Sequence, residues 1–441
     1  MEKQAMQYGL DEWPPPARML VFGLQWLAVT IVTVIIIGKV VAGLQYSDPG
    51  QQLLYMQKLF FVMGAALLFQ ILWGHRMPLI TGPATVLLVA ILAGSDSSVD
   101  AIYTSIAAGG AFLVLLSITG LFSRMAGLFT PRVVAAILIL IALTITPTIL
   151  NLLLMGASQE NILTHLGFAL IFFVTMVLAD RLLPGIWKST MMVWAIVGGS
   201  FLCLLLLPPD NWRRAGDAGV VAPFFSGFTT SPVWEPGLLI SFVICFIALS
   251  INDLGSIRAL GQIIRPPAME RRVSAGITLS GFANMVAGFF GVIGPVNFSM
   301  SVGIVAANGN ASRFTMIPTS MGMMTMAFFP AVVAFTWNVP ALVVGTLLLY
   351  IMCAQMAAGL MVAFGNGEFS FQDGLTLGIP MMLGILVSYM PPEVRVALPP
   401  LLVPILGNGF VVGVFAALSL EHIVFRRSRR EKAEEEVLSQ H

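Results

Sequence analysis

Residues 294–313 read GPVNFSMSVGIVAANGNASR, and an earlier stretch, residues 82–94, reads GPATVLLVAILAG. Both open with Gly-Pro and belong to apolar segments of about 15–17 residues, short of the roughly 20 that a membrane-spanning helix needs. Proline removes a backbone donor and glycine adopts conformations that other residues avoid, so Gly-Pro predicts an extended stretch followed by a short helix that starts at the proline. Because unpaired backbone is costly in hydrocarbon, each break must line a cavity or lie inside the protein.

The rest of the chain is apolar enough to place these breaks in a membrane. Of 441 residues, 58% are hydrophobic and 10% are charged, with a mean hydropathy of +0.92. A soluble domain is about 45–50% apolar and about 25% charged, so the composition predicts an all-α polytopic membrane protein. About fourteen apolar spans are expected, at residues 18–45, 53–73, 78–94, 101–123, 132–154, 161–183, 187–207, 233–254, 273–292, 294–309, 314–336, 339–364, 374–390 and 396–425.

The two Gly-Pro breaks occupy the third and tenth of these segments, seven positions apart. Because seven is odd, a repeat of seven segments would insert its second copy upside down, which is the inverted-repeat plan of secondary transporters. In that plan, paired broken helices meet near the bilayer midplane and direct their N-termini at the substrate. The alternative, that Gly82-Pro83 and Gly294-Pro295 are kinks in buried helices, stays open on this pattern alone.

The charge distribution predicts the orientation of the chain. With the N-terminus in the cytoplasm, most of the 22 Lys and Arg residues fall in loops on one side, including those of an extramembrane stretch at 255–272. This asymmetry indicates a multi-pass protein of a bacterial-type inner (plasma) membrane with both termini cytoplasmic. The N-terminus lacks the basic region and cleavage site of a signal peptide, so the first span is expected to be retained. A net charge of +1 gives no field to recruit nucleic acid.

No pattern in the sequence indicates catalysis or metal binding. Cys203, Cys245 and Cys353 lie far apart in apolar runs, and the four histidines are scattered. No nucleophile–base pair or metal-ligand spacing occurs among them. The chain is therefore expected to be neither an enzyme nor a holder of a cofactor, with H⁺ or Na⁺ as candidate coupling ions.

Segment eight carries the polar run SINDLGS at residues 250–256. An ionisable residue within a span costs about 2.5–3.5 kcal/mol on insertion scales, which makes Asp253 a functional candidate. Asp253 is interpreted either as a coupling or gating carboxylate or as an interfacial residue paired with Arg258 or another cytoplasmic arginine, and both interpretations stay open. Asn252 and Ser256 are four residues apart, hence on one helical face.

Segment ten places Asn297, Ser299 and Ser301 in an otherwise apolar half-helix. Such groups suit a polar, neutral, planar ligand between apolar walls, whereas the alternative is hydrogen bonding between helices. Gln25, deep in the first span, is open to the same two interpretations. Phe298 is placed to stack on a base, although an aromatic residue there also fits ordinary packing.

Four stretches resemble the nucleobase–ascorbate transporter family, also called the xanthine/uracil permeases. GLQWLA at 23–28 is similar to the family's entry into the first span, and MPLITGPAT at 77–85 to its third-span Pro-x-x-x-Gly pattern. SINDLGS at 250–256 is similar to its eighth-span Glu-x-x-Gly region, and residues 294–313 to its signature stretch. The span count and hydropathy extend the resemblance over nearly the whole chain.

The resemblance implies seven plus seven inverted spans, divided between a core domain and a gate domain. Short antiparallel strands in spans three and ten meet, and the base binds there. Family members often pair through the gate domain, so a homodimer is expected. The implied division is a core at 18–125 and 233–336, a gate at 132–207 and 339–425, and a cytoplasmic tail at 426–441.

Several family positions hold other residue types here. The eighth-span substrate carboxylate falls on Asn252, and the ionisable residue one turn later falls on Ser256. The tenth-span Glu or Gln falls on Met300, and the Asn after it on Ser301. The chain thus lacks both acids that usually grip the base and relay protons, and Asp253 is the nearest carboxylate, assigned to coupling or gating. The expected substrate-binding residues are Gln25, Ala84, Thr85, Asn252, Ser256, Asn297, Phe298, Ser299, Met300 and Ser301.

The residues and the resemblance together predict a secondary-active permease for a uracil- or xanthine-like base, coupled to H⁺. The alternative is an anion or other polar metabolite carried on the same fold, since the missing acids remove negative charge from the site. A channel is a further alternative, which saturable uptake would exclude. The expected partners are the small-molecule substrate and the lipid bilayer.

Overall fold

The computed structural model describes most of the chain. The described residues are 7–122, 127–157, 159, 161–207, 221, 223–365, 369–391, 393–394, 397–399 and 402–425. The tail 426–441, predicted to be a cytoplasmic extension, lies outside them.

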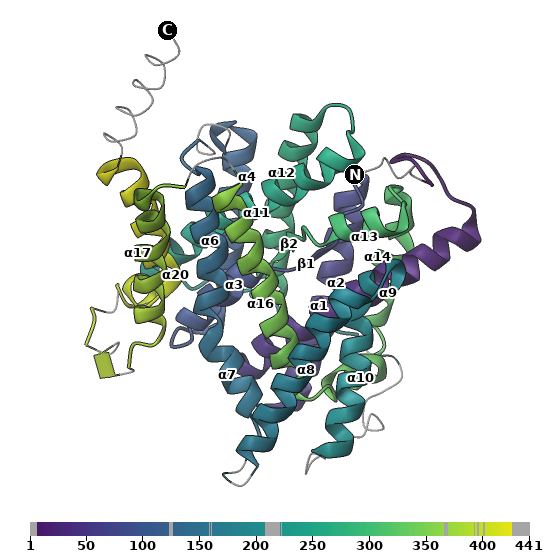
Figure 1. Ribbon diagram of the computed structural model, residues 1–441, viewed down its shortest axis with the longest axis horizontal. Helices are drawn as coiled ribbons and strands as arrows, with labels where there is room; N and C mark the ends of the chain where they lie inside the picture. The colour runs from purple at the N-terminus through teal and green to yellow at the C-terminus, as the bar shows by residue number, and fades with distance from the viewer. Residues whose placement is uncertain are drawn as a thin grey trace. The chain divides into compact units, whose positions relative to one another are not determined.

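The described residues are mainly helical. The first part of the chain contains α1 (Pro16–Gln45), α2 (Pro49–Leu72), α3 (Thr85–Ala93), α4 (Val99–Ile118), α6 (Pro131–Thr144), α7 (Thr146–Leu154), α8 (Ile162–Leu182), α9 (Gly185–Ser189) and α10 (Met191–Leu206). The second part contains α11 (Pro236–Ile264), α12 (Met269–Phe290), α13 (Ser301–Asn308), α14 (Ile317–Met326), α15 (Pro330–Trp337), α16 (Ala341–Phe364), α17 (Phe371–Ser388), α19 (Val403–Leu406) and α20 (Gly409–Ser419). Two short strands, β1 (Thr81–Pro83) and β2 (Pro295–Asn297), precede α3 and α13 and lie side by side (Figure 1).

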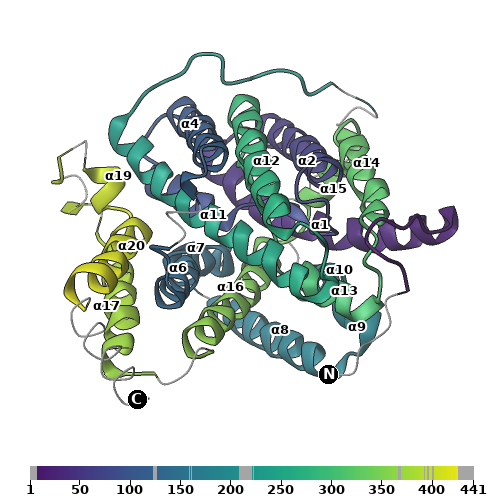
Figure 2. The same cartoon turned by 90° about the horizontal axis from the view of Figure 1, so that it is seen from above.

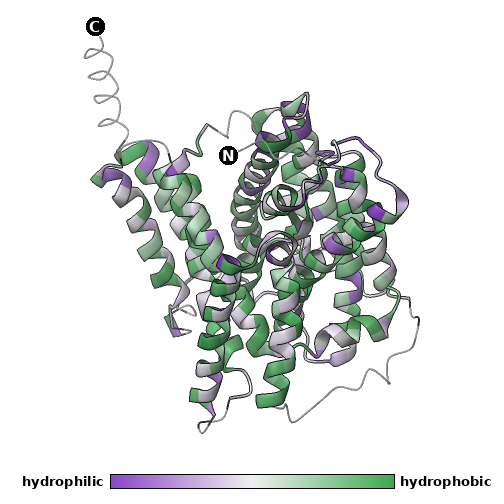
Figure 3. Ribbon diagram, turned by 45° about the vertical axis from the view of Figure 1, so that its right-hand side comes forward, coloured by the Kyte–Doolittle hydropathy of each residue, from purple (hydrophilic) through white to green (hydrophobic). Residues whose placement is uncertain are grey.

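Within the described part of the chain, nine helices are long and apolar enough to cross a bilayer, judged by length and composition. They are α1, α2, α4, α8, α11, α12, α16, α17 and the joined pair α6–α7. Figure 3 shows that the helices are hydrophobic over most of their length. The prediction of an all-α polytopic membrane protein with short strands in two interrupted spans is confirmed.

Local sequence explains where several helices begin. Proline occupies the first turn of α1, α2, α6 and α11, where its missing N–H leaves no helix bond unmade. Asp48 caps α2 by accepting from Gln51 N (2.9 Å), and Ser370 and Asp373 form a reciprocal cap on α17.

The chain forms two compact units. The first contains Met1–Thr119 and Thr148–Tyr350, and the second contains Gly120–Pro147 and Ile351–His441. Both strands, α1 to α4 and α8 to α15 belong to the first unit, whereas α6, α17, α19 and α20 belong to the second. Residues 148–207, which the resemblance assigns to a gate domain, cluster with the first unit. The division into core and gate domains stays a prediction.

In the first unit, α12 lies between α4 and α2 (Figure 2). Glycines bring α4 and α12 together: a Cβ on Gly110 would lie 2.7 Å from Gly281 O, and one on Gly288 would lie 2.6 Å from Tyr103 O. Small residues of this kind let membrane helices approach backbone to backbone. The close packing fixes α12, which carries several polar side chains toward the strands.

The second unit combines apolar packing with an ion-pair network. Arg132, at the start of α6, lies 2.5 Å from Asp373 of α17 and 3.6 Å from Glu421. The apolar contacts of the same helices include Ala135, Ala136, Leu377 and Ala417. Since Asp373 and Glu421 are both buried, the arginine offsets carboxylate charge that burial would otherwise make costly.

The eighth span extends further than predicted. An end at residue 254 is wrong, because α11 continues to Ile264 and α12 begins at Met269. Buried apolar residues such as Ile257 extend the inner face of α11 and keep it helical. The stretch 255–272, predicted to lie outside the membrane, is therefore helical except for the turn between Ile264 and Met269.

The segment Gln7–Trp13, which we term the N-terminal clasp, runs beside the loop that follows α13. Tyr8 pairs with Asn310 in a parallel bridge. Arg313 Nε lies 2.7 Å from Asp11 Oδ1. The clasp thus ties the start of the chain to the end of the tenth segment.

Candidate functional site

The two interrupted segments meet in an antiparallel ribbon. The register of β1 on β2 is Thr81↔Asn297, Gly82↔Val296 and Pro83↔Pro295. Pairing continues at both ends, since Ala84 N donates to Gly294 O (2.9 Å) and Phe298 N donates to Ile80 O (2.9 Å). The two breaks are therefore paired backbone rather than kinks in continuous helices.

Both prolines lie in the strands, which corrects the prediction that each short helix starts at its proline. α3 begins at Thr85 and α13 at Ser301. Pro83 and Pro295 oppose each other at positions whose N–H groups would point away from the partner strand. The missing donors therefore leave no ladder bond unmade.

The starts of the two half-helices leave backbone amides without partners. Among the described residues, no acceptor takes the N–H groups of Thr85 and Val86 at α3, or those of Ser299 and Met300 before α13. A helix start carries partial positive charge and is suited to bind carbonyl oxygens and anions. Val86 is buried, so the amides of Ser299 and Met300, whose residues are exposed, are the ones most accessible to a ligand.

Part of the predicted site is accessible. Six predicted residues are at least partly accessible: Gln25, Thr85, Asn252, Phe298, Ser299 and Met300. The last five, which lie at the two half-helix starts and on α11, are termed the site face. Met300 is 37% exposed, and the face carries no ionisable side chain. No group of three or more His, Cys, Asp and Glu residues in the described ranges could hold a metal ion. The face is therefore suited to a neutral polar ligand.

α11 presents neighbouring side chains in different directions. Asp253 is fully buried, and its Oδ1 accepts from Asn297 N of β2 (2.8 Å). This bond fixes α11 beside β2, where Asn252 is half-buried and its side chain has no hydrogen-bond partner among the described residues. Ser256, predicted to share the face of Asn252, is only 1% exposed. Asn252 is thus the polar side chain that α11 offers to a ligand.

The interfacial interpretation of Asp253 is wrong. Arg258 pairs instead with Glu270 (3.2 Å), and both side chains are exposed. Asp253 lies in the interior because α11 runs well past the predicted end of its span. Its role in coupling or gating stays a prediction.

Two residues that were predicted to bind the substrate instead join the interrupted segments to each other. Asn297 and Ser301 are fully buried. Asn297 Oδ1 accepts from Thr81 Oγ1 (2.9 Å), and Ser301 Oγ accepts from Ile80 N (2.9 Å). Their polar atoms therefore support the ribbon and lie outside the accessible face.

Two further predicted residues also lie off the site face. Gln25 Oε1 accepts from Asn308 Nδ2 (3.4 Å), at the C-terminal end of α13. Ala84 is buried, and its N–H is used in the ribbon. The ring of Phe298 stays on the face but is packed against Gly82, where a Cβ would lie 2.5 Å from it.

Several polar side chains behind β2 were not predicted from the sequence. Gln70 Nε2 of α2 donates to Ser280 Oγ (3.0 Å), and Asn284 Nδ2 of α12 donates to Pro295 O (2.9 Å). All three side chains are buried, as is His75. The available signal was that Gln70 and Asn284 are lone amides in apolar runs, as Gln25 is.

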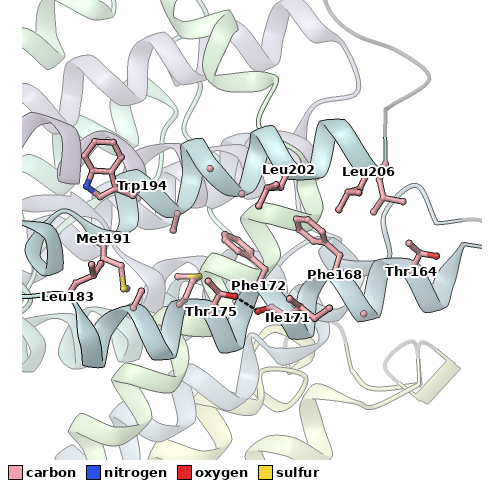
Figure 4. Close-up of a pocket in the computed structure, with 17 residues that line it drawn as sticks. Thr164, Phe168, Ile171, Phe172, Thr175, Leu183, Met191, Trp194, Leu202 and Leu206 are labelled. Atoms are coloured by element: carbon pink, nitrogen blue, oxygen red, sulfur yellow. Dashed lines mark hydrogen bonds between the residues drawn. The ribbon is translucent and has the colours of Figure 1, made fainter.

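A cavity of about 550 Å³ lies between α8 and α10 and is lined by no residue of the ribbon or the site face. Its walls are largely apolar and include Phe168, Phe172 and Leu202 (Figure 4). The hydroxyl of Thr175 is already used by Ile171 O (2.8 Å). Since a neutral polar ligand would find few partners there, this cavity is not the candidate substrate site.

Comparison with known proteins agrees with this geometry. Residues 17–393 match the family model described as "Permease family", which represents xanthine/uracil permeases. The chain is 27% identical over 425 residues to xanthine permease of Bacillus subtilis (strain 168), with 94% of each chain covered. It is 25% identical over 435 residues to a putative purine permease of the same organism, covering 94% of this chain and 97% of the relative.

A solved structure confirms the fold. The transmembrane domain of the cyanobacterial bicarbonate transporter BicA aligns with a TM-score of 0.63 at 15% identity, covering 84% of this chain and 95% of that one. The shared architecture is the seven-plus-seven inverted-repeat fold, as predicted. The family match over most of the sequence shows that the chain belongs to the xanthine/uracil permease family, whose members are transporters and not enzymes.

Proposed function

We propose that this chain is a secondary-active transporter of a neutral nucleobase, with an oxopurine such as xanthine as the first candidate. The observation that carries the proposal is the pair of half-helix starts, whose unpaired amides adjoin an uncharged, partly accessible face. The xanthine permease and the putative purine permease among its relatives support a purine. A uracil-like base presents the same kind of carbonyl edge.

The chemistry of an oxopurine matches the groups on the site face. Its carbonyl oxygens accept from the free amides of Ser299 and Met300. Its ring N–H groups donate to the side-chain oxygen of Asn252, whose nitrogen donates to a neighbouring acceptor on the base. The half-buried ring of Phe298 offers an aromatic surface for stacking.

Coupling to H⁺ or Na⁺ and alternating access between core and gate domains belong to the same proposal. The family's acidic positions correspond here to Asn252 and Met300, so the site face holds no proton acceptor of its own. The distribution of basic residues supports cytoplasmic termini in the plasma membrane. A homodimer through the gate domain completes the proposed assembly.

Uptake of radiolabelled xanthine into proteoliposomes tests the proposal. We expect saturable uptake that other oxopurines inhibit strongly, uracil inhibits more weakly, and bicarbonate and sulfate do not inhibit. Inhibition by the anions without inhibition by bases would instead support an anion transporter on this fold. Uptake that rises without saturation would support a channel.

The side chain of Asn252 gives the most direct test of the site. Asn252→Ala should abolish xanthine uptake at an unchanged level of folded protein, because a site that pairs with polar groups of its ligand discriminates strongly through them. Ile240→Ala is the matched control on the same helix, since Ile240 is 46% exposed, and it should keep wild-type kinetics. Unchanged uptake kinetics in Asn252→Ala would refute the site.

A further inference from the structure

Among the residues that the structure describes, no third strand pairs with the edge of β2 that faces away from β1. Gly294 O and Phe298 N point toward β1, where they bond to Ala84 and Ile80. In an antiparallel pair the alternate residues point the other way, so the polar groups of residues 295 and 297 need partners elsewhere. Inside a membrane protein an open strand edge is costly, because no water is there to bind it.

Two side chains occupy the place of the missing strand. Asp253 Oδ1, from α11, accepts from Asn297 N (2.8 Å). Asn284 Nδ2, from α12, donates to Pro295 O (2.9 Å). Both side chains are fully buried, and together they supply one acceptor and one donor to consecutive outward groups of β2.

The surroundings hold these two side chains in place. Asn284 Nδ2 also donates to Ser280 O (2.7 Å), and a Cβ on Gly294 would overlap the Asn284 side-chain oxygen. The side chain of Asn297 reaches Ser280 Oγ (3.4 Å), which also accepts from Gln70. β2 is thus bonded directly to α11 and α12, and through Ser280 to Gln70 of α2.

We propose that Asp253 and Asn284 are positioning residues that substitute for a strand and fix β2, and through it the free amides before α13. They do not touch the substrate. Asp253 Oδ1 accepts from a neutral backbone amide, and the polar side chains that also interact with the carboxylate, those of Ser280 and Asn297, are neutral as well. An uncharged acceptor of the same shape therefore suffices, so Asp253 acts through its geometry and not through its charge.

The transport readout of this inference rests on the proposed function, so the first measurement is independent of substrate. Hydrogen–deuterium exchange of the peptide covering 294–300 should be faster in Asp253→Leu and Asn284→Asp than in the wild type. It should be unchanged in Asp253→Asn, which keeps the acceptor. Val286→Ala, on the outer side of α12, is the matched control and should leave the exchange unchanged.

The second measurement is xanthine uptake across pH. Loss of the bond should raise KM about tenfold in Asp253→Leu, in line with one lost hydrogen bond. Asp253→Asn should keep wild-type KM and the wild-type pH profile. Where Asp253→Leu does not fold, Asp253→Ser, whose hydroxyl is too short to reach the amide, replaces it.

The outcomes separate this inference from the proposed function. If Asp253→Asn shifts the pH profile or loses accumulation as Asp253→Leu does, the carboxylate acts through its charge and the inference fails. If exchange of 294–300 does not change in Asp253→Leu, the side chain does not hold β2. Absence of nucleobase uptake by the wild type would overturn the proposed function and leave the exchange result standing.

Discussion

The two interrupted segments have the same backbone arrangement, a strand followed by a short helix, but differ in how far their side chains are exposed. In α3, residues Val86 to Ile91 are all buried. In α13 and the turn before it, Ser299, Met300 and Gly303 are exposed. Both segments contribute a strand and a helix start with unpaired amides, but the first offers a ligand only the half-buried Thr85, whereas the second offers Phe298, Ser299 and Met300.

This difference indicates a division of roles between the two halves. The first segment mainly supplies a buried apolar support, whereas the second supplies most of the surface on which substrate choice depends. Substitutions in the first segment should therefore change stability, and substitutions in the second should change transport.

The largest expected effect contrasts two glycines of the second segment. Gly294→Ala should leave little folded protein and reduce uptake to roughly a tenth or less, because its Cβ would overlap the side chain of Asn284 in a packed interior. Gly303→Ala has no atom within 4 Å of its Cβ, so it should preserve stability or raise it by about 0.5–1 kcal/mol, as alanine favours a helix. Fluorescence-detected size exclusion and uptake measure both. Equal losses in the two variants would contradict the packing described at β2.

A second pair tests the division between the segments directly. Leu88 is fully buried in α3, so Leu88→Ala should lower stability by about 2–5 kcal/mol and leave the KM of the folded fraction unchanged. Met300→Ala should leave the melting temperature unchanged and alter the KM for xanthine by about three- to tenfold. Thermal unfolding in detergent and uptake kinetics give the two readouts. A large KM change in Leu88→Ala would show that the first segment also shapes the site.

The smallest expected effect concerns the clasp at the end of the second segment. Arg313 is 6% exposed and its Nη1 donates to Ile71 O (2.6 Å), so Arg313→Gln should cost about 1–3 kcal/mol through an unsatisfied buried group. Asp11→Asn removes only the exposed partner of the ion pair and should cost less than about 1 kcal/mol. Melting temperatures compare the two. A larger effect of Asp11→Asn would mean that the ion pair, and not the carbonyl contact, holds the clasp.

The sequence predicted the features that follow from the backbone properties of individual residue types. Gly82-Pro83 and Gly294-Pro295 marked the breaks because proline and glycine restrict the backbone wherever they occur. The depth of Asp253 was not predictable in the same way, since the basic residues after it suggested an earlier end to the helix. Spacing revealed the helical face of Asn252 but gave no indication that Ser256, on the same side, would be covered.

The hydrogen-bond partners of the buried side-chain amides could not be predicted from the sequence either. Gln70 and Ser280 are 210 positions apart, and nothing local to either one specifies the other. The role of Asn284 becomes evident only in the folded protein, where Gly294 lets β2 approach its side chain closely. A polar residue in an apolar span therefore signals a bond, while the fold alone identifies the partner.

The ribbon also has a consequence for how the protein is made. Thr81 and Asn297 are 216 positions apart, so β1 leaves the ribosome long before its partner strand exists. Throughout that interval, the translocation machinery or neighbouring helices must shield its peptide groups from lipid. A chain truncated before the tenth segment would lack that partner entirely, and we expect it to be degraded instead of accumulating as a stable half.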